Sequence, residues 1–276
     1  DEKISAKDFK FDEVGFLMTG KRIDTSKIDY STPKLDVEPK MEVSNLNVPG
    51  KVENVSFKLH QNEVLGITGL LGGGQGELAL ALFGAIPSKS DFIKVEGKEV
   101  KIKNIHDSVT AGFGYVPADR IRVGLFMEHK IFENIVPLVV DTLVNKLRFL
   151  LPNKLRETAQ KWVDELDVKT PSVDLPAQSL SGGNQQRLVL AKWMAADPTV
   201  LIMDGPTVGV DIGSKAEIHE LMRSMGKAGR GVILISDDIP ELLQVCNRIL
   251  VMRDGHIIGE HYSKETSEEV LYNELV

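Results

Sequence analysis

The chain has 276 residues, of which 42% are hydrophobic and 26% are charged, and its formal net charge is −7. These values are typical of a soluble globular protein, and the acidic balance argues against a general nucleic-acid binder, which would normally be basic. No apolar run approaches the roughly 20 residues that span a bilayer, so we expect any membrane association to depend on a protein partner. The single cysteine, Cys246, excludes an intramolecular disulfide and fits a reducing compartment.

The first forty residues differ in character from the rest of the chain. Residues 5–19 are predicted to form a short amphipathic helix, and residues 21–40 are polar, contain two prolines and are typical of a linker. A folded piece followed by a linker suggests that residues 1–20 are the tail of a preceding domain. We expect the main domain to occupy residues 41–276.

The main domain begins with a β pattern and then alternates helices with strands. Alternating apolar residues over 54–59 predict a half-buried strand, and a turn leads from it into a second strand at 64–67. The other predicted elements are a helix at 77–83, a hairpin at 92–102, a helix-rich region at 128–178, parallel strands at 200–204 and 232–235, and a hairpin around Asp254. This order predicts an α/β fold with a mixed sheet, a small antiparallel β region and a helical subdomain near 128–178.

A glycine-rich loop follows the strand at 64–67 and opens the next helix. It reads Gly69-Leu70-Leu71-Gly72-Gly73-Gly74-Gln75-Gly76-Glu77. The spacing places glycines at the first and sixth positions of a phosphate-binding P-loop. A working P-loop continues with Lys, which reaches the β- and γ-phosphates, and with Ser or Thr, which binds Mg²⁺, whereas this chain has Gln75 and Gly76. The loop is either a tight turn without a ligand or a damaged phosphate loop whose backbone still cradles phosphates weakly.

A second glycine-containing stretch lies just before the predicted strand at 200–204. It reads Leu180-Ser181-Gly182-Gly183-Asn184-Gln185-Gln186. Ser181 and the two glycines suit a loop whose backbone N–H groups open onto a helix, which makes an anion site. The apolar strand then delivers one carboxylate, Asp204, to the edge of the sheet. The simpler alternatives are a glycine-rich helix start and a turn-capping role for Asp204.

From about residue 41 to residue 260, the chain resembles the ATPase domains of ABC transporters. The heptad at 180–186 resembles the family's signature motif, Asp204 its Walker B aspartate, and Asp211 the D-loop aspartate that crosses the interface between two domains. Residues 168–172, 179–186 and 209–215 resemble the second, degenerate domain of bacterial sugar importers of the ribose, galactose and xylose type, and residues 16–21 resemble the tail of the first domain. The resemblance implies a P-loop NTPase-like ABC fold.

The same resemblance implies that no residue that would catalyse hydrolysis at the chain's own site is intact. The position of the family's catalytic glutamate holds Gly205, and the glutamine of its Q-loop would lie near Ala118. The position of its switch histidine holds Asp237, although Asp237 and Asp238 would equally well cap the helix that begins near Pro240. We therefore expect no hydrolysis of ATP at this site.

ATP and Mg²⁺ are expected to bind weakly, if at all, at the chain's own site. The expected contacts are residues 69 and 72–77 with Ala118 and Asp204, and Asp204 would be a weak or indirect ligand of Mg²⁺. In this family two domains meet head to tail, and each nucleotide lies between the P-loop of one and the signature of the other. Residues 180–185 are therefore expected to complete the ATP site of a catalytic partner domain, expected in the N-terminal half of the same chain.

The implied function is that of a nucleotide-binding domain of a transporter that imports a simple sugar. The implied partners are a membrane permease, contacted by the helical subdomain and residues 115–127, and indirectly a solute-binding protein, with no nucleic acid. The implied location is cytoplasmic, on the inner face of the cell membrane. Two alternatives stay open, namely a nucleoside importer and a scaffold module that has the ABC fold without a transport role.

Overall fold

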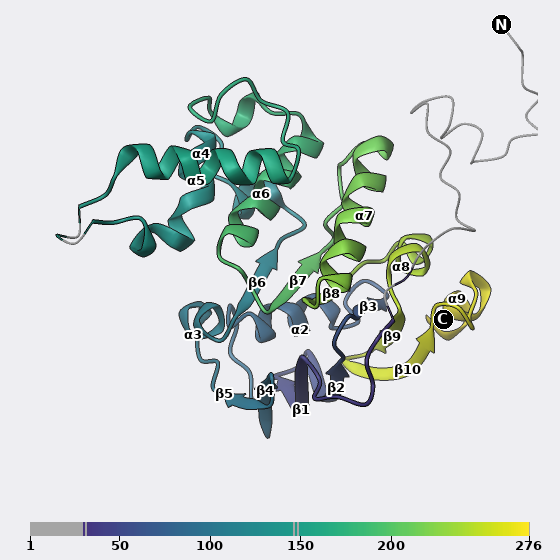
Figure 1. Cartoon of the computed structure of the whole chain (residues 1–276). Coiled ribbons are helices and arrows are strands. Elements are labelled where there is room, and N and C mark those ends of the chain that lie inside the picture. The colour runs from purple at the N-terminus through teal and green to yellow at the C-terminus, as the bar shows by residue number, and fades with distance from the viewer. Residues whose placement is uncertain (1–29, 31, 146, 148, 276) are drawn as a thin grey trace, which may run out of the picture.

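The computed structural model describes residues 30, 32–145, 147 and 149–275 (Figure 1). The predicted helix at 5–19, the predicted domain tail at 1–20 and half of the predicted linker lie outside the described residues. In the described part of that linker, Lys34 forms an isolated antiparallel bridge with Gln61. The remaining described residues form two sheets with helices packed on them.

The first sheet is antiparallel and has the strand order β2-β1-β4-β5. Buried and exposed side chains alternate along β2, because one face of the sheet packs on the core and the other faces solvent. The sheet confirms the predicted strand at 54–59 and the predicted hairpin at 92–102. Its strands are β1 (Met41–Val48), β2 (Val52–Leu59), β4 (Phe92–Val95) and β5 (Lys98–Val100).

The second sheet has the order β10-β9-β3-β8-β7-β6, in which all strands except the edge strand β10 run parallel. Side chains are buried along the whole of β3 and β8, as expected of parallel strands that are covered on both faces. The predicted parallel strands and the terminal hairpin are confirmed. The strands are β3 (Val64–Gly69), β6 (Phe113–Val116), β7 (Val200–Asp204), β8 (Gly231–Ile235), β9 (Arg248–Arg253) and β10 (His256–Tyr262).

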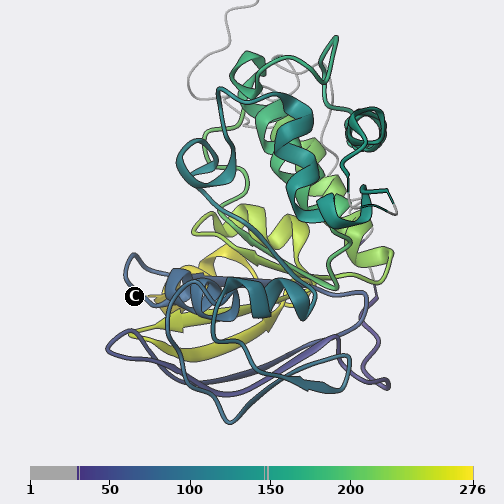
Figure 2. The same ribbon diagram turned by 90° about the vertical axis from the view of Figure 1, so that its left-hand side faces the viewer.

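Helix α2 (Gln75–Leu82) lies between the two sheets, since it contacts β1 in one sheet and β3, β7 and β8 in the other. Figure 2 shows most of the other helices on the face of the larger sheet that points away from the antiparallel sheet. They are α4 (Ile131–Ile135), α5 (Pro152–Glu165), α6 (Gly182–Ala195), α7 (Ile212–Lys227) and α8 (Ile239–Val245), while α3 (Ile105–Thr110) precedes β6 and α9 (Glu268–Leu275) packs beside α8.

The predicted helical subdomain at 128–178 contains α4, a 3₁₀ segment at Val136–Thr142, α5 and a short 3₁₀ turn at Ala177–Ser179. Ala159 and Val163 are buried on the face of α5 that its periodicity predicted. Helix α2 begins two residues earlier than the predicted start at 77. The reason is local, because Gly74 has the left-handed φ of 101° at the N-cap position and the helical turn starts directly after it.

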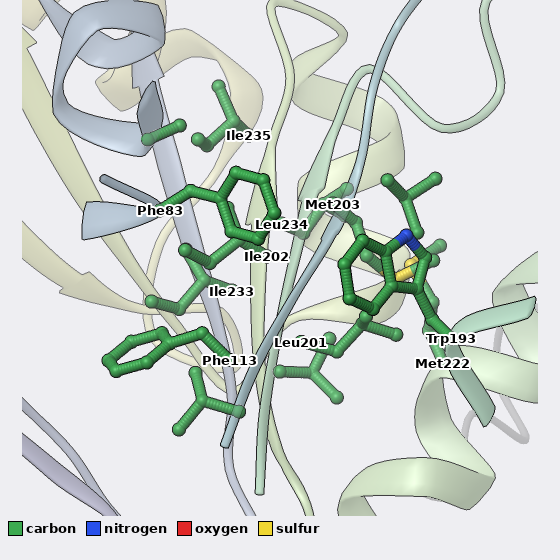
Figure 3. Close-up of a cluster of buried hydrophobic side chains, with 14 of the residues drawn as sticks. Phe83, Phe113, Trp193, Leu201, Ile202, Met203, Met222, Ile233, Leu234 and Ile235 are labelled. Carbon is green, nitrogen blue, oxygen red and sulfur yellow. The ribbon is translucent and has the colours of Figure 1, made fainter. Parts of the chain in front are cut away.

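Side chains from the parallel strands form the centre of the core (Figure 3). Trp193 from α6, Met222 from α7 and Phe83 from the end of α2 close around them. The cluster includes Phe113, Leu201, Ile202, Met203, Ile233, Leu234 and Ile235. Cys246 is fully buried, and this burial raises the pKa of its thiol well above the usual value. Among the described residues, no helix is both long enough and apolar enough to cross a membrane.

A buried ion pair joins the two sheets near the turn between β2 and β3. Arg248 Nε lies 2.8 Å from Glu63 Oε1, and the two side chains are 6% and 1% exposed. Arg248 Nη2 also donates to the carbonyl oxygen of Lys58, at 2.5 Å, in the antiparallel sheet. The guanidinium therefore links β9 to the end of β2.

Replacing Arg248 by Met should lower the free energy of unfolding by about 3–5 kcal/mol, because Glu63 is left buried with an uncompensated charge. The double variant Glu63→Gln, Arg248→Met removes both charges and should recover much of that loss. Urea denaturation of the three proteins measures the difference. Equal destabilisation by the single and double variants would mean that the ion pair has no part in holding the sheets together.

Candidate functional site

The backbone of the predicted phosphate loop has the conformation that its glycines allow. Gly72 and Gly74 have φ values of +84° and +101°, in the left-handed region. A Cβ on Gly74 would lie 2.8 Å from the carbonyl oxygen of Lys51. The turn between β9 and β10 supports the loop from outside, since the amide of Gly255 donates to the carbonyl of Gly73 at 3.0 Å. The glycines and the neighbouring turn therefore give the loop its shape.

The side chain of Gln75 lies across the inside of this loop. Its Nε2 donates to the carbonyl oxygens of Gly69, at 3.1 Å, and Leu70, at 3.2 Å. Its Oε1 lies 2.8 Å and 3.0 Å from the points where a Cβ would stand on Gly69 and Gly73, and it is buried without a hydrogen-bond partner among the described residues. A phosphate that enters the loop must therefore displace a neutral amide that already bonds to the loop.

Gly76 and Glu77 complete the first turn of α2. No atom lies within 4 Å of the point where a Cβ on Gly76 would stand, so a serine or threonine would fit there. Glu77 forms an ion pair with Lys51, 3.3 Å away. The missing hydroxyl at position 76 is therefore a difference of chemistry alone, because the space for it is present.

Asp204 stands at the carboxyl end of β7 with one carboxylate oxygen already bonded. The hydroxyl of Tyr115 donates to Asp204 Oδ2 at 2.8 Å. Burial raises the pKa of Asp204, and this hydrogen bond offsets part of that rise. Burial and the neighbouring Asp204 carboxylate both raise the pKa of Tyr115, which keeps its proton for this bond. A metal ion at Asp204 would bind a carboxylate whose Oδ2 already accepts a hydrogen bond from Tyr115.

Tyr115 is a site residue that the sequence analysis missed. It pairs with Ile202 in the register of β6 and β7, and Asp204 lies two residues beyond Ile202 on the same face of the sheet. The ring of Phe83 stacks on Tyr115 with centroids 5.0 Å apart and holds it in place. The signal that could have identified Tyr115 was therefore the strand register, which needs the pairing of distant segments.

Gly205, Ala118 and Asp237 follow the carboxyl ends of β7, β6 and β8. Gly205 has the left-handed φ of +53°, and a Cβ there would stand 3.2 Å from the Cβ of Ala118 and 3.1 Å from Cγ2 of Val208. A glutamate at position 205 would thus meet both backbone strain and a close neighbour. The predicted Q-loop position and the predicted glutamate position are in contact, and neither has a side chain that could activate water.

The helix after β8 is capped by one of the two candidate aspartates. Asp238 is the N-cap of α8, and its side chain accepts a hydrogen bond from the amide of Glu241 at 3.1 Å. Lys215 also donates to Asp238, at 2.5 Å. Asp237 is exposed and is not the cap. The capping alternative therefore holds for Asp238, and Asp237 is the carboxylate that stands free at the edge.

The predicted signature residues form the start of α6. Ser181 is the N-cap and is exposed, yet its hydroxyl does not cap the helix and instead accepts from Asn184 Nδ2 at 2.9 Å. Asn184 in turn accepts from the amide of Lys169 at 2.8 Å, and Gln185 Nε2 donates to the carbonyl of Leu180 at 3.0 Å. The side chains hold the loop shape and leave the first-turn amides without a side-chain cap.

The second glycine of the signature is packed against the start of α7. A Cβ on Gly183 would stand 2.2 Å from Ser214 Oγ and 3.4 Å from Asp211 Oδ2. Asp211 is the N-cap of α7 and accepts from the amide of Ser214 at 3.0 Å, and these hydrogen bonds lower the pKa of its carboxyl. The predicted signature and the predicted D-loop therefore form one surface, which only glycine at position 183 allows.

A buried polar cluster, also missed from sequence, lies behind this edge and centres on Glu241 of α8. It accepts from Thr207 at 2.6 Å, His219 at 2.8 Å and Ser236 at 2.6 Å. Burial alone would raise the pKa of Glu241, but the hydrogen bonds from these three side chains outweigh it and lower the pKa to about 2. The cluster fixes the segments that follow β7 and β8 to α7 and α8.

Restoring both missing P-loop side chains should strengthen nucleotide binding. The variant Gln75→Lys, Gly76→Thr adds a cation that reaches phosphates and a hydroxyl that binds Mg²⁺, and it removes the amide from the loop. We expect Mg-ATP to bind at least about tenfold more tightly than to the unchanged chain, measured by calorimetry. Gly76→Thr alone is the control. Equal affinity of all three proteins would mean that Gln75 does not limit binding.

The polar cluster around Glu241 should make stability depend on acid. Folding lowers the pKa of Glu241 from the ordinary value of 4.5 to about 2. The ionised carboxylate therefore stabilises the folded state at pH values above 4.5, and this contribution disappears as the pH falls towards 2. Glu241→Gln should therefore lower the free energy of unfolding by about 3 kcal/mol at neutral pH and by progressively less in acid.

Urea denaturation at several pH values measures this dependence, with the exposed Glu99→Gln as the matched control. A deficit of Glu241→Gln that stays the same from pH 7 to pH 3 or so would contradict a depressed pKa.

Comparison with known proteins agrees with this geometry. The family profile described as ABC transporter matches residues 52–208, which is more than half of the chain. A ribose import ATP-binding protein of Rhizobium meliloti is 39% identical over 97% of this chain and 53% of its own length. A protein of Burkholderia ambifaria named for ribose, galactose and methyl galactoside import is 38% identical over 94% of this chain and 50% of its own length.

Solved structures show the same fold. MJ1267, an ATP-binding cassette of an ABC transporter, superposes with a TM-score of 0.73 at 19% identity, covering 87% of this chain and all (100%) of that one. CbiO1 from Clostridium perfringens superposes with a TM-score of 0.70 at 22% identity, covering 87% of this chain and 93% of that one. The chain spans about half the length of the curated relatives named above. On its sequence and on its P-loop NTPase-like α/β fold, the chain belongs to the ABC transporter family.

Proposed function

We propose that this chain is a nucleotide-binding domain of an ABC importer, in which its signature residues complete the ATP site of a partner domain and its own site does not hydrolyse ATP. The observation that carries the proposal is the start of α6. Ser181 is exposed there, and no side chain caps the amides of the first turn.

The uncapped turn is well suited to a phosphate. The first amides of a helix point outward and lie at the positive end of its dipole, so an anion is stabilised there. Helix α2, which follows the predicted phosphate loop, is likewise without a side-chain cap, whereas α7 and α8 carry Asp211 and Asp238 as caps, which already fill this place with a carboxylate. The signature helix offers donors in fixed positions, which is the arrangement that stabilises charge in a transition state.

The chain's own site supports the other half of the proposal. Gln75 takes the place of the phosphate-binding lysine and bonds to the loop, and Tyr115 bonds to Asp204. Gly205 takes the place of the glutamate, and losing a general base costs about 10²–10⁴ in rate. The backbone cradle fits a nucleotide phosphate weakly, but the side chains do not fit Mg-ATP in the arrangement that hydrolysis needs.

The partner would be an ABC domain that keeps these side chains. We place it in the N-terminal half of the same polypeptide, with residues 1–20 as its tail and residues 21–40 as the linker. About half of each relative's length lies outside the matched region, which is enough for a domain of similar size. The names of the relatives favour a simple sugar such as ribose or galactose as the cargo.

A permease would connect the domain to the inner face of the membrane. The segment after β6 exposes apolar side chains, with Ile121 55%, Val123 69% and Phe126 64% accessible. Leu138, in the helical subdomain, is 36% accessible. Exposed apolar side chains gathered in one region favour a protein contact. A solute-binding protein would then act through the permease.

Ser181→Ala should lower ATP turnover of the assembled transporter by about 10²–10³, because it removes a donor to the phosphate of the partner's nucleotide. The matched control is Ser267→Ala, because Ser267 is an exposed serine just before α9, and this variant should leave ATP turnover unchanged. Steady-state ATPase assays measure both.

Calorimetry of Mg-ATP on this chain alone and on its mixture with the partner domain should detect binding in the mixture and little or none in the chain alone.

Turnover that survives Ser181→Ala but is lost in Asp204→Asn would contradict the proposal, because the chain's own site would then be the catalytic one. Normal turnover in the absence of any membrane permease, together with purification of the full-length protein with soluble partners only, would favour a scaffold module instead.

A further inference from the structure

Arg120 is a buried cation that bonds to main-chain carbonyl groups. It begins the π-helical turn Arg120–Gly124 after β6 and is 8% exposed. Its Nη1 donates to the carbonyl of Val208 at 2.8 Å, and its Nη2 donates to the carbonyl of Gly209 at 3.0 Å. Its Nε is buried with no hydrogen-bond partner in the part of the chain that the structure describes. The guanidinium therefore fixes the backbone of the predicted D-loop.

The same guanidinium lies against the signature. A Cβ on Gly182 would stand 2.9 Å from Arg120 Nη2 and 3.3 Å from the carbonyl oxygen of Gly209. A side chain at position 182 would crowd the end of the Arg120 side chain and the carbonyl of Gly209, so the first glycine of the signature allows both to approach closely, as the second allows the approach of Ser214. Arg120 thus lies between two segments that are about sixty to ninety residues further along the chain.

The turn that carries Arg120 is also attached to α6 at its other end. Lys192 Nζ donates to the carbonyl of Gly124 at 2.7 Å. A Cβ on Gly124 would stand 3.2 Å from Cγ2 of Val189, so the turn lies close on the helix. The side chains of Ile121, Arg122 and Val123 all face outward from this turn, and the two apolar ones, Ile121 and Val123, are 55% and 69% exposed. A load on these side chains would therefore act directly on α6 and on the D-loop.

We propose that Arg120 is a positioning residue, which transmits the position of the exposed turn at Arg120–Gly124 to the D-loop and to the signature. This inference rests on the proposed function, since it makes a permease that contacts the turn control the ATP site of the partner domain. The route avoids the chain's own nucleotide site. Ala118, two residues earlier, has no side chain with which to sense a phosphate there.

The first test uses this chain alone and hydrogen exchange of its backbone amides. Arg120→Gln should speed exchange of amides at 205–211 and at 181–187 by at least about tenfold, because both segments lose their common support. Arg230→Gln is the matched control, since Arg230 Nη1 also donates to a loop carbonyl, that of Pro198 at 3.0 Å, at the opposite end of β8. Faster exchange at 120–124 alone would overturn the inference.

The second test measures how strongly the permease stimulates ATP turnover in the full-length transporter. Arg120→Gln should lower the ratio of permease-stimulated to unstimulated turnover by about threefold to tenfold, whereas Arg230→Gln should not change it. A purely structural role would reduce both rates and leave their ratio unchanged. Arg120→Lys, which keeps the charge but not the fork that reaches two carbonyls, should give an intermediate ratio and guards against misfolding of the glutamine variant.

Ser181→Ala distinguishes a failure of this inference from a failure of the proposed function. If Ser181→Ala lowers turnover while both Arg120 variants keep the ratio of the unchanged protein, the inference is wrong and the proposed function stands. If Ser181→Ala has no effect on turnover, the proposed function fails and the inference fails with it.

Discussion

The parallel register of β3, β8, β7 and β6 is the constraint on which the rest of the molecule depends. Ile67 of β3 and Asp204 of β7 both pair with Ile235 of β8, and Val116 of β6 pairs with Met203. All four strands therefore end at one edge, and the segments that follow them meet there. Buried apolar side chains set this register, so it persists whatever chemistry the loops carry.

Because the register does not depend on the loops, the residues at this edge can differ without a change in the arrangement of the strands. Internal donors stand where ligand groups would act, because buried polar atoms need partners. Gln75 bonds to the carbonyls of the phosphate loop, and Tyr115 bonds to the carboxylate of Asp204. Glu241 is satisfied by three side chains. Gln75 Nε2, Asp204 and Glu241 therefore each have a hydrogen-bond partner within the protein.

The signature side is built on the opposite principle. Its two glycines allow the close approach of Arg120 and Ser214, while the first turn of α6 has no side-chain cap. The signature glycines pack tightly against Arg120 and Ser214, and no side chain caps the backbone amides of the first turn of α6. Because the backbone of this turn is fixed by packing, its amides would need little reorganisation to bind an anion. These features are the ones on which the proposed contact of the signature with a partner's nucleotide rests.

The sequence by itself determined the elements and the family. Apolar periodicity predicted several of the strands and the helical subdomain, and the heptad at 180–186 with Asp204 and the segments at 168–172 and 209–215 carried the resemblance. These signals are local, because they depend on residues within one turn or one strand of each other. The positions of Gln75, Gly76 and Gly205 within these motifs could likewise be read from the sequence alone.

Only the tertiary structure decided which side chains meet at the carboxyl edge of the sheet and what joins the motifs. The contacts of Tyr115 with Asp204, and of Arg120 with Val208 and Gly209, cross nearly ninety residues of chain. The close approach of Ala118 and Val208 to Gly205 also appears only in the folded chain. No local pattern encodes such pairs, since they arise when register and helix packing bring distant side chains to the same place.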